Sequence, residues 1–145
     1  MTHLKSPARL AAALAASLLL AGAAAAGPLT VTVDGVEARG GKLYIGVQTE
    51  AQFMQDEGVA GQIFETPAAG SLSASFDLPE GRYAVSVWHD INADGVFDVD
   101  AQGVPLDGWS SLNAASLTAA PTFDQAAVFV PAGGISVTLD MVYPQ

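Results

Sequence analysis

Short runs in which apolar and polar residues alternate dominate the chain after residue 28. Glycine, proline and aspartate separate the runs, and a period of two residues is typical of a strand with one buried face. No segment after residue 26 shows an apolar i, i+3, i+4 pattern over more than about two helical turns. We therefore predict an all-β fold, a single-domain antiparallel β-sandwich of about seven strands. The clearest runs are 29–34, 43–48, 72–78, 83–89, 126–130 and 135–143.

Turn residues between these runs indicate how the strands pair. Gly40-Gly41 separates the first two runs, which we expect to be neighbouring antiparallel strands. Pro79-Glu80-Gly81 separates runs 72–78 and 83–89, which we expect to form a hairpin. The stretch 51–70 is less regular, and we expect a long loop there with a short strand or a helical turn.

The first 26 residues have the layout of a secretory signal peptide. Lys5 and Arg9 precede an apolar run over 10–20, and small residues fill 21–26. We predict cleavage after Ala26, which leaves a sandwich domain over 27–145. The alternative is an uncleaved membrane anchor, but that needs about 20 strongly apolar residues. We therefore expect a secreted or periplasmic protein with no membrane contact in its mature form.

The predicted mature chain is strongly acidic and lacks cysteine. All fifteen acidic residues follow residue 26, against the three bases Arg39, Lys42 and Arg82, so its net charge is −12. This charge repels phosphate backbones and anionic headgroups, so we expect no nucleic-acid partner and no membrane docking through basic patches. The absence of cysteine excludes disulfides, thiolate nucleophiles, zinc–thiolate sites and a lipid-modified cysteine.

One acidic segment predicts a metal site. Near a protein surface, closely spaced carboxylates repel one another by about 1 kcal/mol or more unless a cation lies among them. The order of residues from 90 to 98, DINADGVFD, matches the D-x-N-x-D-G-x-x-D core of a calcium loop, in which a glycine allows a sharp bend. We predict a calcium ion bound by Asp90, Asn92, Asp94, the Val96 carbonyl, Asp98 and Asp100.

The segment departs from an EF-hand in two respects. Its twelfth position is Ala101 where a bidentate glutamate is usual, and a predicted strand precedes it where an EF-hand has a helix. Asp100 and Asp107 are the candidates for the remaining oxygen ligands. The alternative interpretation is a turn rich in aspartate and glycine, with solvated carboxylates and no ion.

His89 is the one histidine after residue 26, which excludes zinc sites built from two or three imidazoles. No G-x-S-x-G motif accompanies it, although a Ser–His–Asp site with Ser86, Ser110 or Ser111 is a formal alternative. Strand alternation places His89 on the inner face. We therefore expect a hydrogen-bonded histidine at a strand end, where it supports the acidic loop.

Trp88 and Trp109 lie on either side of the acidic loop. Exposed tryptophans of exported proteins can stack on sugars. Large aromatic residues at the two ends of a long loop more often pack it against the fold, and this is the role we expect here.

The segment 76–98, FDLPEGRYAVSVWHDINADGVFD, resembles a family of secreted bacterial proteins catalogued as domain of unknown function 2141. The later segments GVP at 103–105, GWS at 108–110 and PTFDQA at 121–126 resemble further motifs of that family. The L-P-x-G-x-Y motif is also similar to prealbumin-like sandwiches such as carboxypeptidase regulatory domains and collagen-adhesin B-type repeats, some of which hold calcium in aspartate loops.

The resemblance implies an exported prealbumin-like or immunoglobulin-like sandwich with a calcium loop and no assigned reaction. Trp109 stands where a Gly-Tyr-Gly-Phe-like stretch is usual in the family, so no ligand specificity follows from the resemblance.

These features predict a secreted or periplasmic, calcium-stabilised β-sandwich that acts as a non-catalytic binding or accessory module. A second hypothesis is a hydrolase in which a metal or His89 activates water. A third is a carbohydrate-binding or adhesion module that uses Trp88 and Trp109, with a sugar or a cell surface as its ligand. No protein partner can be inferred.

Overall fold

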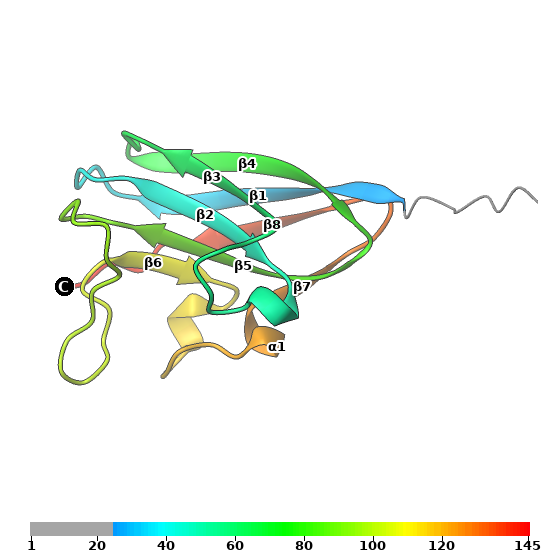
Figure 1. Cartoon of the computed structure of the whole chain (residues 1–145). Helices are drawn as coiled ribbons and strands as arrows, with labels where there is room; N and C mark the ends of the chain where they lie inside the picture. The colour runs from blue at the N-terminus through cyan, green and yellow to red at the C-terminus, as the bar shows by residue number, and fades with distance from the viewer. Residues whose placement is uncertain (1–24) are drawn as a thin grey trace, which may run out of the picture.

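The computed structural model describes residues 25–145, which form two β-sheets packed face to face (Figure 1). The predicted all-β sandwich is confirmed, with eight strands. Strand order is β4-β1-β8 in one sheet and β3-β2-β5-β6 in the other, where β7 also pairs with β5. The strands are β1 (Ala26–Val36), β2 (Leu43–Gln48), β3 (Ala60–Phe64), β4 (Gly70–Pro79), β5 (Gly81–His89), β6 (Gly108–Ser111), β7 (Ala127–Val130) and β8 (Ile135–Asp140).

Helical structure within the described residues is confined to short turns. These are the 3-10 turns η1 (Glu50–Gln52) and η2 (Ala114–Ser116) and the single α-helical turn α1 (Phe123–Ala126). None of these helices is long or apolar enough to span a bilayer. Residues 1–24 of the predicted signal peptide lie outside the described residues, so its cleavage after Ala26 stays a prediction.

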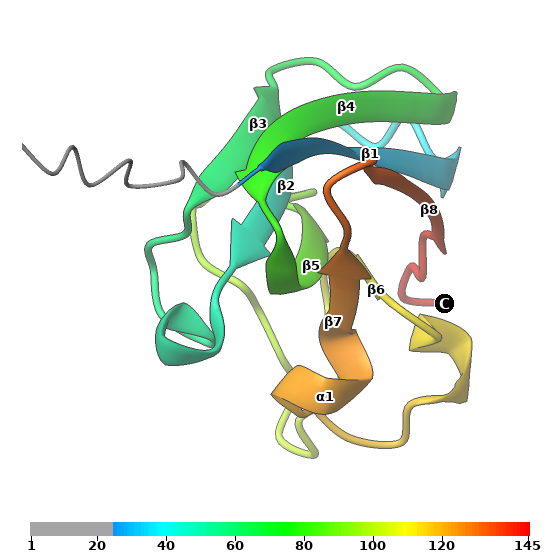
Figure 2. The same ribbon diagram turned by 90° about the vertical axis from the view of Figure 1, so that its right-hand side faces the viewer.

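The short connections of the described chain cross from one sheet to the other (Figures 1 and 2). The predicted pairing of 29–34 with 43–48 and the predicted hairpin of 72–78 with 83–89 are therefore wrong. Alternation of apolar residues shows that a strand has one buried face, but both sheets bury a face against the same interior, so alternation does not reveal which sheet a strand joins. The crossing segments are 37–42, 65–69, Glu80 and 131–134.

The L-P-x-G-x-Y motif builds one of these corners. Only Glu80 separates β4 from β5, and the Tyr83 hydroxyl donates a hydrogen bond to the Pro79 carbonyl oxygen at 2.8 Å. This bond closes the corner four residues upstream of the tyrosine, which is how a tyrosine corner stabilises a sandwich. The motif therefore directs the chain from one sheet to the other.

Strand β1 is the central strand of the three-stranded sheet. It runs antiparallel to β4, with Leu29 opposite Phe76, and parallel to β8, with Leu29 opposite Ile135. The predicted antiparallel sandwich therefore contains one parallel pair, β1 with β8. Because β7 and β8 lie in different sheets, no hairpin forces β8 to run antiparallel to its neighbour.

The hydrophobic core lies between the two sheets and consists mainly of the alternating inward residues. Each sheet contributes one apolar face, as the periodicity predicts. Short helical turns lie below β5 and β7 in Figure 1, and both η1 and α1 contact β5. The buried core residues are Leu29, Val31, Val33, Val36, Leu43, Ile45, Val47, Leu78, Tyr83, Val85, Val87, Val130 and Leu139.

Replacing Leu29 with alanine should lower the free energy of unfolding by about 2–5 kcal/mol, because it leaves a cavity between the sheets. Ile135, opposite Leu29 on β8, is 36% exposed, so Ile135→Ala should cost about 1 kcal/mol or less. Urea unfolding followed by tryptophan fluorescence measures both values. Equal losses would contradict the placement of Leu29 in the interior.

Candidate calcium-binding loop

The acidic segment forms a long loop that joins two neighbouring strands and protrudes from the end of the sandwich (Figure 1). It leaves β5 after His89 and returns at Gly108, the first residue of β6. His89 and Gly108 are register partners in the antiparallel β5–β6 pair, so the two ends of the loop lie side by side. The loop therefore has a fixed base on the five-stranded sheet.

Asp107 anchors the loop from inside. Its side chain is 1% exposed, and its carboxylate accepts hydrogen bonds from the Trp88 Nε1–H at 2.9 Å, the Ile91 N–H at 3.2 Å and the Asp98 N–H at 3.3 Å. Three donors compensate the cost of burying a carboxylate. Asp107 therefore uses its oxygens to hold the loop on β5, and the sequence alone did not distinguish this role from metal binding.

Asp90 shapes the first turn of the loop. It is 3% exposed, and its two carboxylate oxygens accept the Asp94 N–H at 3.2 Å and the Gly95 N–H at 2.9 Å. Gly95 has a φ of 78°, a value that favours glycine and produces the sharp bend of the D-x-N-x-D-G motif. The backbone thus wraps around the Asp90 carboxylate.

The Asn92 amide lies between two carboxylates. Its Nδ2 donates to Asp94 Oδ2 at 3.0 Å and to Asp98 Oδ2 at 2.8 Å. The Asp94 carboxylate also accepts the Val96 N–H at 2.9 Å. Asp94 and Asp98 therefore converge on a single NH2 group, and all three side chains are accessible from solvent.

The structure brings only part of the predicted ligand set together. Asp100 lies at the tip of the loop, where its Oδ1 accepts the Gln102 and Val104 N–H groups at 2.9 Å each. Within residues 25–145, no three carboxylate or imidazole side chains are grouped closely enough to hold a metal ion. The partial cluster consists of Asn92, Asp94 and Asp98.

Trp88 packs the loop against the sheet. Its ring stacks on Tyr44 with centroids 4.7 Å apart, and the Phe97 ring meets it edge-on at 6.3 Å. Trp109 is its register partner on β6, and the Trp109 backbone bonds to that of Val142. These contacts occupy much of the Trp88 ring, as expected for an aromatic residue that fixes a loop.

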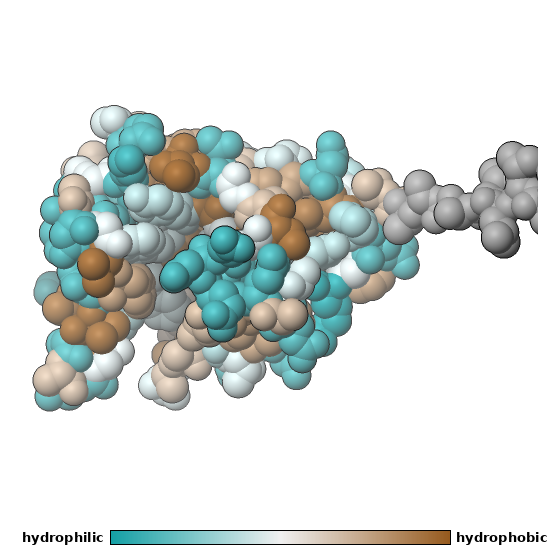
Figure 3. All heavy atoms as spheres, viewed as in Figure 1, coloured by the Kyte–Doolittle hydropathy of each residue, from teal (hydrophilic) through white to brown (hydrophobic). Residues whose placement is uncertain are grey.

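The distal half of the loop is an ordered hairpin with exposed apolar side chains. The Asp100 N–H donates to the Val104 carbonyl at 2.9 Å, and the Leu106 N–H donates to the Asp98 carbonyl at 2.8 Å. Figure 3 shows hydrophobic atoms on this part of the surface. The exposed large apolar residues of the whole loop are Val96, Phe97, Val99, Val104 and Leu106.

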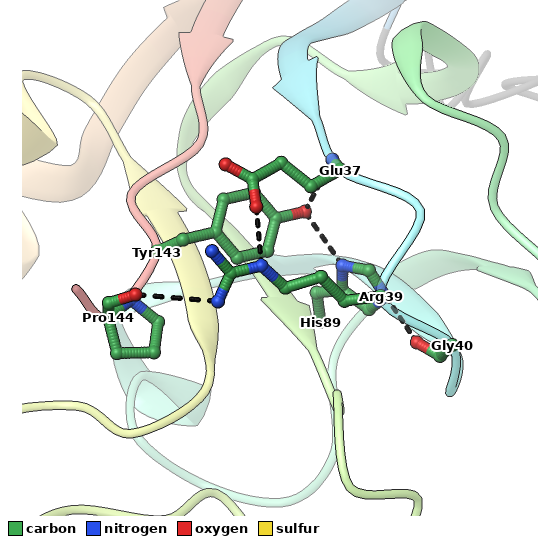
Figure 4. Close-up of polar contacts among 6 residues, drawn as sticks. All are labelled: Glu37, Arg39, Gly40, His89, Tyr143 and Pro144. Carbon is green, nitrogen blue, oxygen red and sulfur yellow. Dashed lines mark hydrogen bonds and ion pairs between the residues drawn. The ribbon is translucent and has the colours of Figure 1, made fainter.

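His89, the last residue of β5, is fully buried. Figure 4 shows its hydrogen-bond partners. Its Nε2 lies 2.7 Å from the Gly40 carbonyl oxygen, which can only accept, so Nε2 carries the proton. In the neutral ring Nδ1 then accepts from the Tyr143 hydroxyl at 2.7 Å. Both nitrogens are engaged, so His89 joins the 37–42 crossing segment and the C-terminal segment to β5.

Tyr143, the hydrogen-bond partner of His89, is half-buried (Figure 4). Its hydroxyl oxygen accepts the Glu37 N–H at 3.1 Å, and Arg39 Cζ lies 4.9 Å from the centre of its ring. A Cβ at Gly108 would lie 2.4 Å from the Tyr143 ring, so only glycine permits this close packing on β6. Burial, opposed by the Glu37 hydrogen bond, raises the pKa of Tyr143 above its ordinary 10.0.

Sequence reasoning missed Tyr143 and the anchoring role of Asp107. Tyr143 continues the alternation of the last strand run, so it gave no sign of a polar role. Its contacts with His89 and Glu37 span 54 and 106 residues of sequence, and only the fold brings such distant positions together.

The chain belongs to the family described as "Uncharacterized protein conserved in bacteria (DUF2141)", whose model matches residues 31–138. The predicted membership is therefore confirmed. No curated protein and no solved structure matches the chain. The similarity to prealbumin-like sandwiches stays a prediction.

Asp107→Asn should lower the free energy of unfolding by roughly 3 kcal/mol, because a buried site loses a charged acceptor of several hydrogen bonds. It should also change the fluorescence of Trp88. Asp100→Asn serves as the matched control, because the carboxylate of Asp100 accepts bonds at the loop tip, and a loss of about 1 kcal/mol or less is expected. An Asp107→Asn variant as stable as the parent chain would contradict the anchoring role.

Tyr143→Phe should destabilise the fold by about 1–3 kcal/mol at pH 8, because the Glu37 N–H and His89 lose their partner. Since the pKa of Tyr143 is raised by folding, its stabilising contribution is complete below about pH 10 and declines as the pH rises through the raised pKa. The difference in the free energy of unfolding between the parent protein and the Tyr143→Phe variant should therefore narrow in alkaline solution. Urea unfolding from pH 8 to 11, with Tyr44→Phe as control, measures it, and a gap that widens above pH 10 would contradict this account.

Proposed function

We propose that the protein is a secreted or periplasmic β-sandwich that serves as a non-catalytic binding or accessory module, and that calcium stabilises its acidic loop. The observation that carries the proposal is the convergence of Asp94 and Asp98 on the Asn92 amide nitrogen. Two carboxylates that face the same group repel each other unless a positive charge lies between them. A hard dication such as calcium supplies that charge, whereas a neutral amide supplies only partial charges.

The side-chain chemistry fits a calcium ion. An asparagine amide has a nitrogen and an oxygen at nearly equivalent positions, so half a turn exchanges a donor for an acceptor. Asn92, Asp94 and Asp98 would then present oxygens to one cation, as the D-x-N-x-D motif requires. Asp90 and the Val96 carbonyl complete the proposed set, with Asp100 as a further candidate. Calcium would supply charge neutralisation and a cross-link between parts of the loop.

The position of His89 supports a module without catalysis. A general base needs a free nitrogen within reach of substrate. Both nitrogens of His89 are hydrogen-bonded inside the protein, and its side chain has no exposed surface. Such a residue does not support the hydrolase hypothesis.

Trp88 gives little support to the carbohydrate-binding hypothesis, because Tyr44 covers one face of its ring and Phe97 contacts the ring.

Calcium should raise the melting temperature of the purified protein. An ion that binds only the folded state adds about 2.7 kcal/mol at a hundredfold excess over Kd. Scanning calorimetry in EDTA and in millimolar calcium measures the shift, and Asp94→Asn with Asp98→Asn should abolish it. Asp77→Asn, an exposed change on β4, is the control and should keep the shift. Equal melting temperatures with and without calcium would refute calcium stabilisation.

A further inference from the structure

A cavity of about 290 Å³ lies at the edge of the sandwich where η2 contacts β8 and β6 approaches it. Ala114, Ala115 and Leu139 contribute apolar wall. Its volume is near the lower end of the range for small-molecule sites, roughly 300–1,000 Å³. None of the proposed calcium ligands lines it. The polar lining residues are Ser111, Asn113, Ser116, Thr138 and Asp140.

The hydroxyl of Ser111 has no hydrogen-bond partner inside the described protein. Ser111 is 4% exposed, and its Oγ is the one buried side-chain nitrogen or oxygen of residues 25–145 that is left without a partner. Burying an unpaired hydroxyl destabilises a fold. Ser111 is one of the residues that line the cavity, so a ligand bound there can supply the missing partner. This group therefore points to a partner from outside the chain.

Other polar groups around the cavity are also available to a ligand. The Asn113 carbonyl accepts from the Ser116 hydroxyl at 2.8 Å, and the Asp140 carbonyl accepts from the Ser110 hydroxyl at 2.7 Å. These bonds occupy the backbone carbonyls of Asn113 and Asp140, not their side chains, and they hold the cavity wall in place. In the described part of the chain, the Asn113 amide, the Thr138 hydroxyl and the Asp140 carboxylate remain free of internal hydrogen bonds.

The charges around the cavity select a neutral ligand. No lysine or arginine lines it, and the three bases among the described residues pair elsewhere, with Glu37, Glu65 and Asp124. Asp140 therefore repels phosphates and carboxylates. Asp140 is the one charged oxygen ligand of the lining, whereas a calcium loop supplies several carboxylates, so the lining lacks the negative charge of a typical dication site. Hydroxyls both donate and accept, as do the hydroxyls of a sugar.

We propose that the cavity between β6, η2 and β8 binds a neutral sugar ring, with Ser111, Asn113, Thr138 and Asp140 as its hydrogen-bonding residues. This site is separate from the acidic loop and does not depend on calcium. Its ligand chemistry, a ring with neighbouring hydroxyls, is shared by free monosaccharides and by the end residue of a glycan chain.

The sheet beside the cavity suits a glycan chain. Thr138 on β8 is the register partner of Thr32 on β1, which is opposite Ser73 on β4. These residues form a row of hydroxyls that leads away from the cavity across the outer face of the three-stranded sheet. A second row runs beside it and consists of Ser136, Thr30 and Ser75, in which the last two hydroxyls lie 3.3 Å apart.

The test is titration of the purified protein, in EDTA, with two sets of neutral sugars. One set holds glucose, galactose, mannose and N-acetylglucosamine, and the other holds the linear tetrasaccharides of glucose, mannose and N-acetylglucosamine. Calorimetry measures binding, and Trp109 fluorescence reports on β6 two residues from Ser111. Saturable binding is expected for at least one sugar.

Ser111→Ala should weaken binding at least tenfold without lowering the melting temperature, since the lost hydroxyl has no internal partner. A purely structural serine would instead lower the melting temperature. Ser86→Ala is the matched control, because Ser86 is the exposed register partner of Ser111 on β5, and it should leave affinity unchanged.

The two sources of the ligand give different results. Equal affinity for a monosaccharide and its tetrasaccharide supports the cavity as a site for a free sugar. Tighter tetrasaccharide binding that Thr32→Val weakens supports a glycan chain lying on the hydroxyl rows. Absence of saturable binding to both sets, or Ser111→Ala binding that equals the parent, would overturn the proposal. Because calcium is absent throughout, neither result depends on the metal hypothesis.

Discussion

The burial of one apolar face from each sheet is the constraint on which the structure depends. In a sandwich without disulfides, this shared interior supplies the main favourable energy of folding. It also constrains the path of the chain. Each short connection joins a strand of one sheet to a strand of the opposite sheet, so that both strands pack against the same interior. The longer connections join strands of one sheet, and the loop between the neighbouring strands β5 and β6 is among them. The acidic loop is therefore mounted on adjacent strands with a rigid base.

Two buried polar residues complete that base. His89 ends β5 and Asp107 precedes β6, and each would destabilise the interior if it had no partners. His89 meets this requirement with Gly40 and Tyr143, which ties two distant segments together. Asp107 meets it with Trp88 and two loop amides. As a result the loop base is fixed by buried hydrogen bonds, while Asn92, Asp94 and the apolar side chains of the hairpin stay in contact with water.

Much of the local structure could be predicted from the sequence, and most of the pairing could not. Alternation located the strands around Val31, Ile45 and Val85 because one side of each must be apolar wherever the strand lies. It failed for β6, which is only four residues long and contains two buried serines. The D-x-N-x-D-G motif predicted a bend at Gly95 and the approach of Asp94 to Asp98, both of which depend on contacts within nine residues.

Local sequence thus determined the all-β class, the strand positions, the family, the acidity and the turn of the acidic loop. These properties follow from periodicity and from interactions between residues near one another in the chain. Only the tertiary structure decided that the short turns are corners between sheets, that β8 runs parallel to β1, and that Tyr143 reaches His89. It alone placed Ser111, Thr138 and Asp140 around one cavity. Such contacts arise when packing brings distant segments together, and residue types spaced along a chain do not encode which partner each will meet.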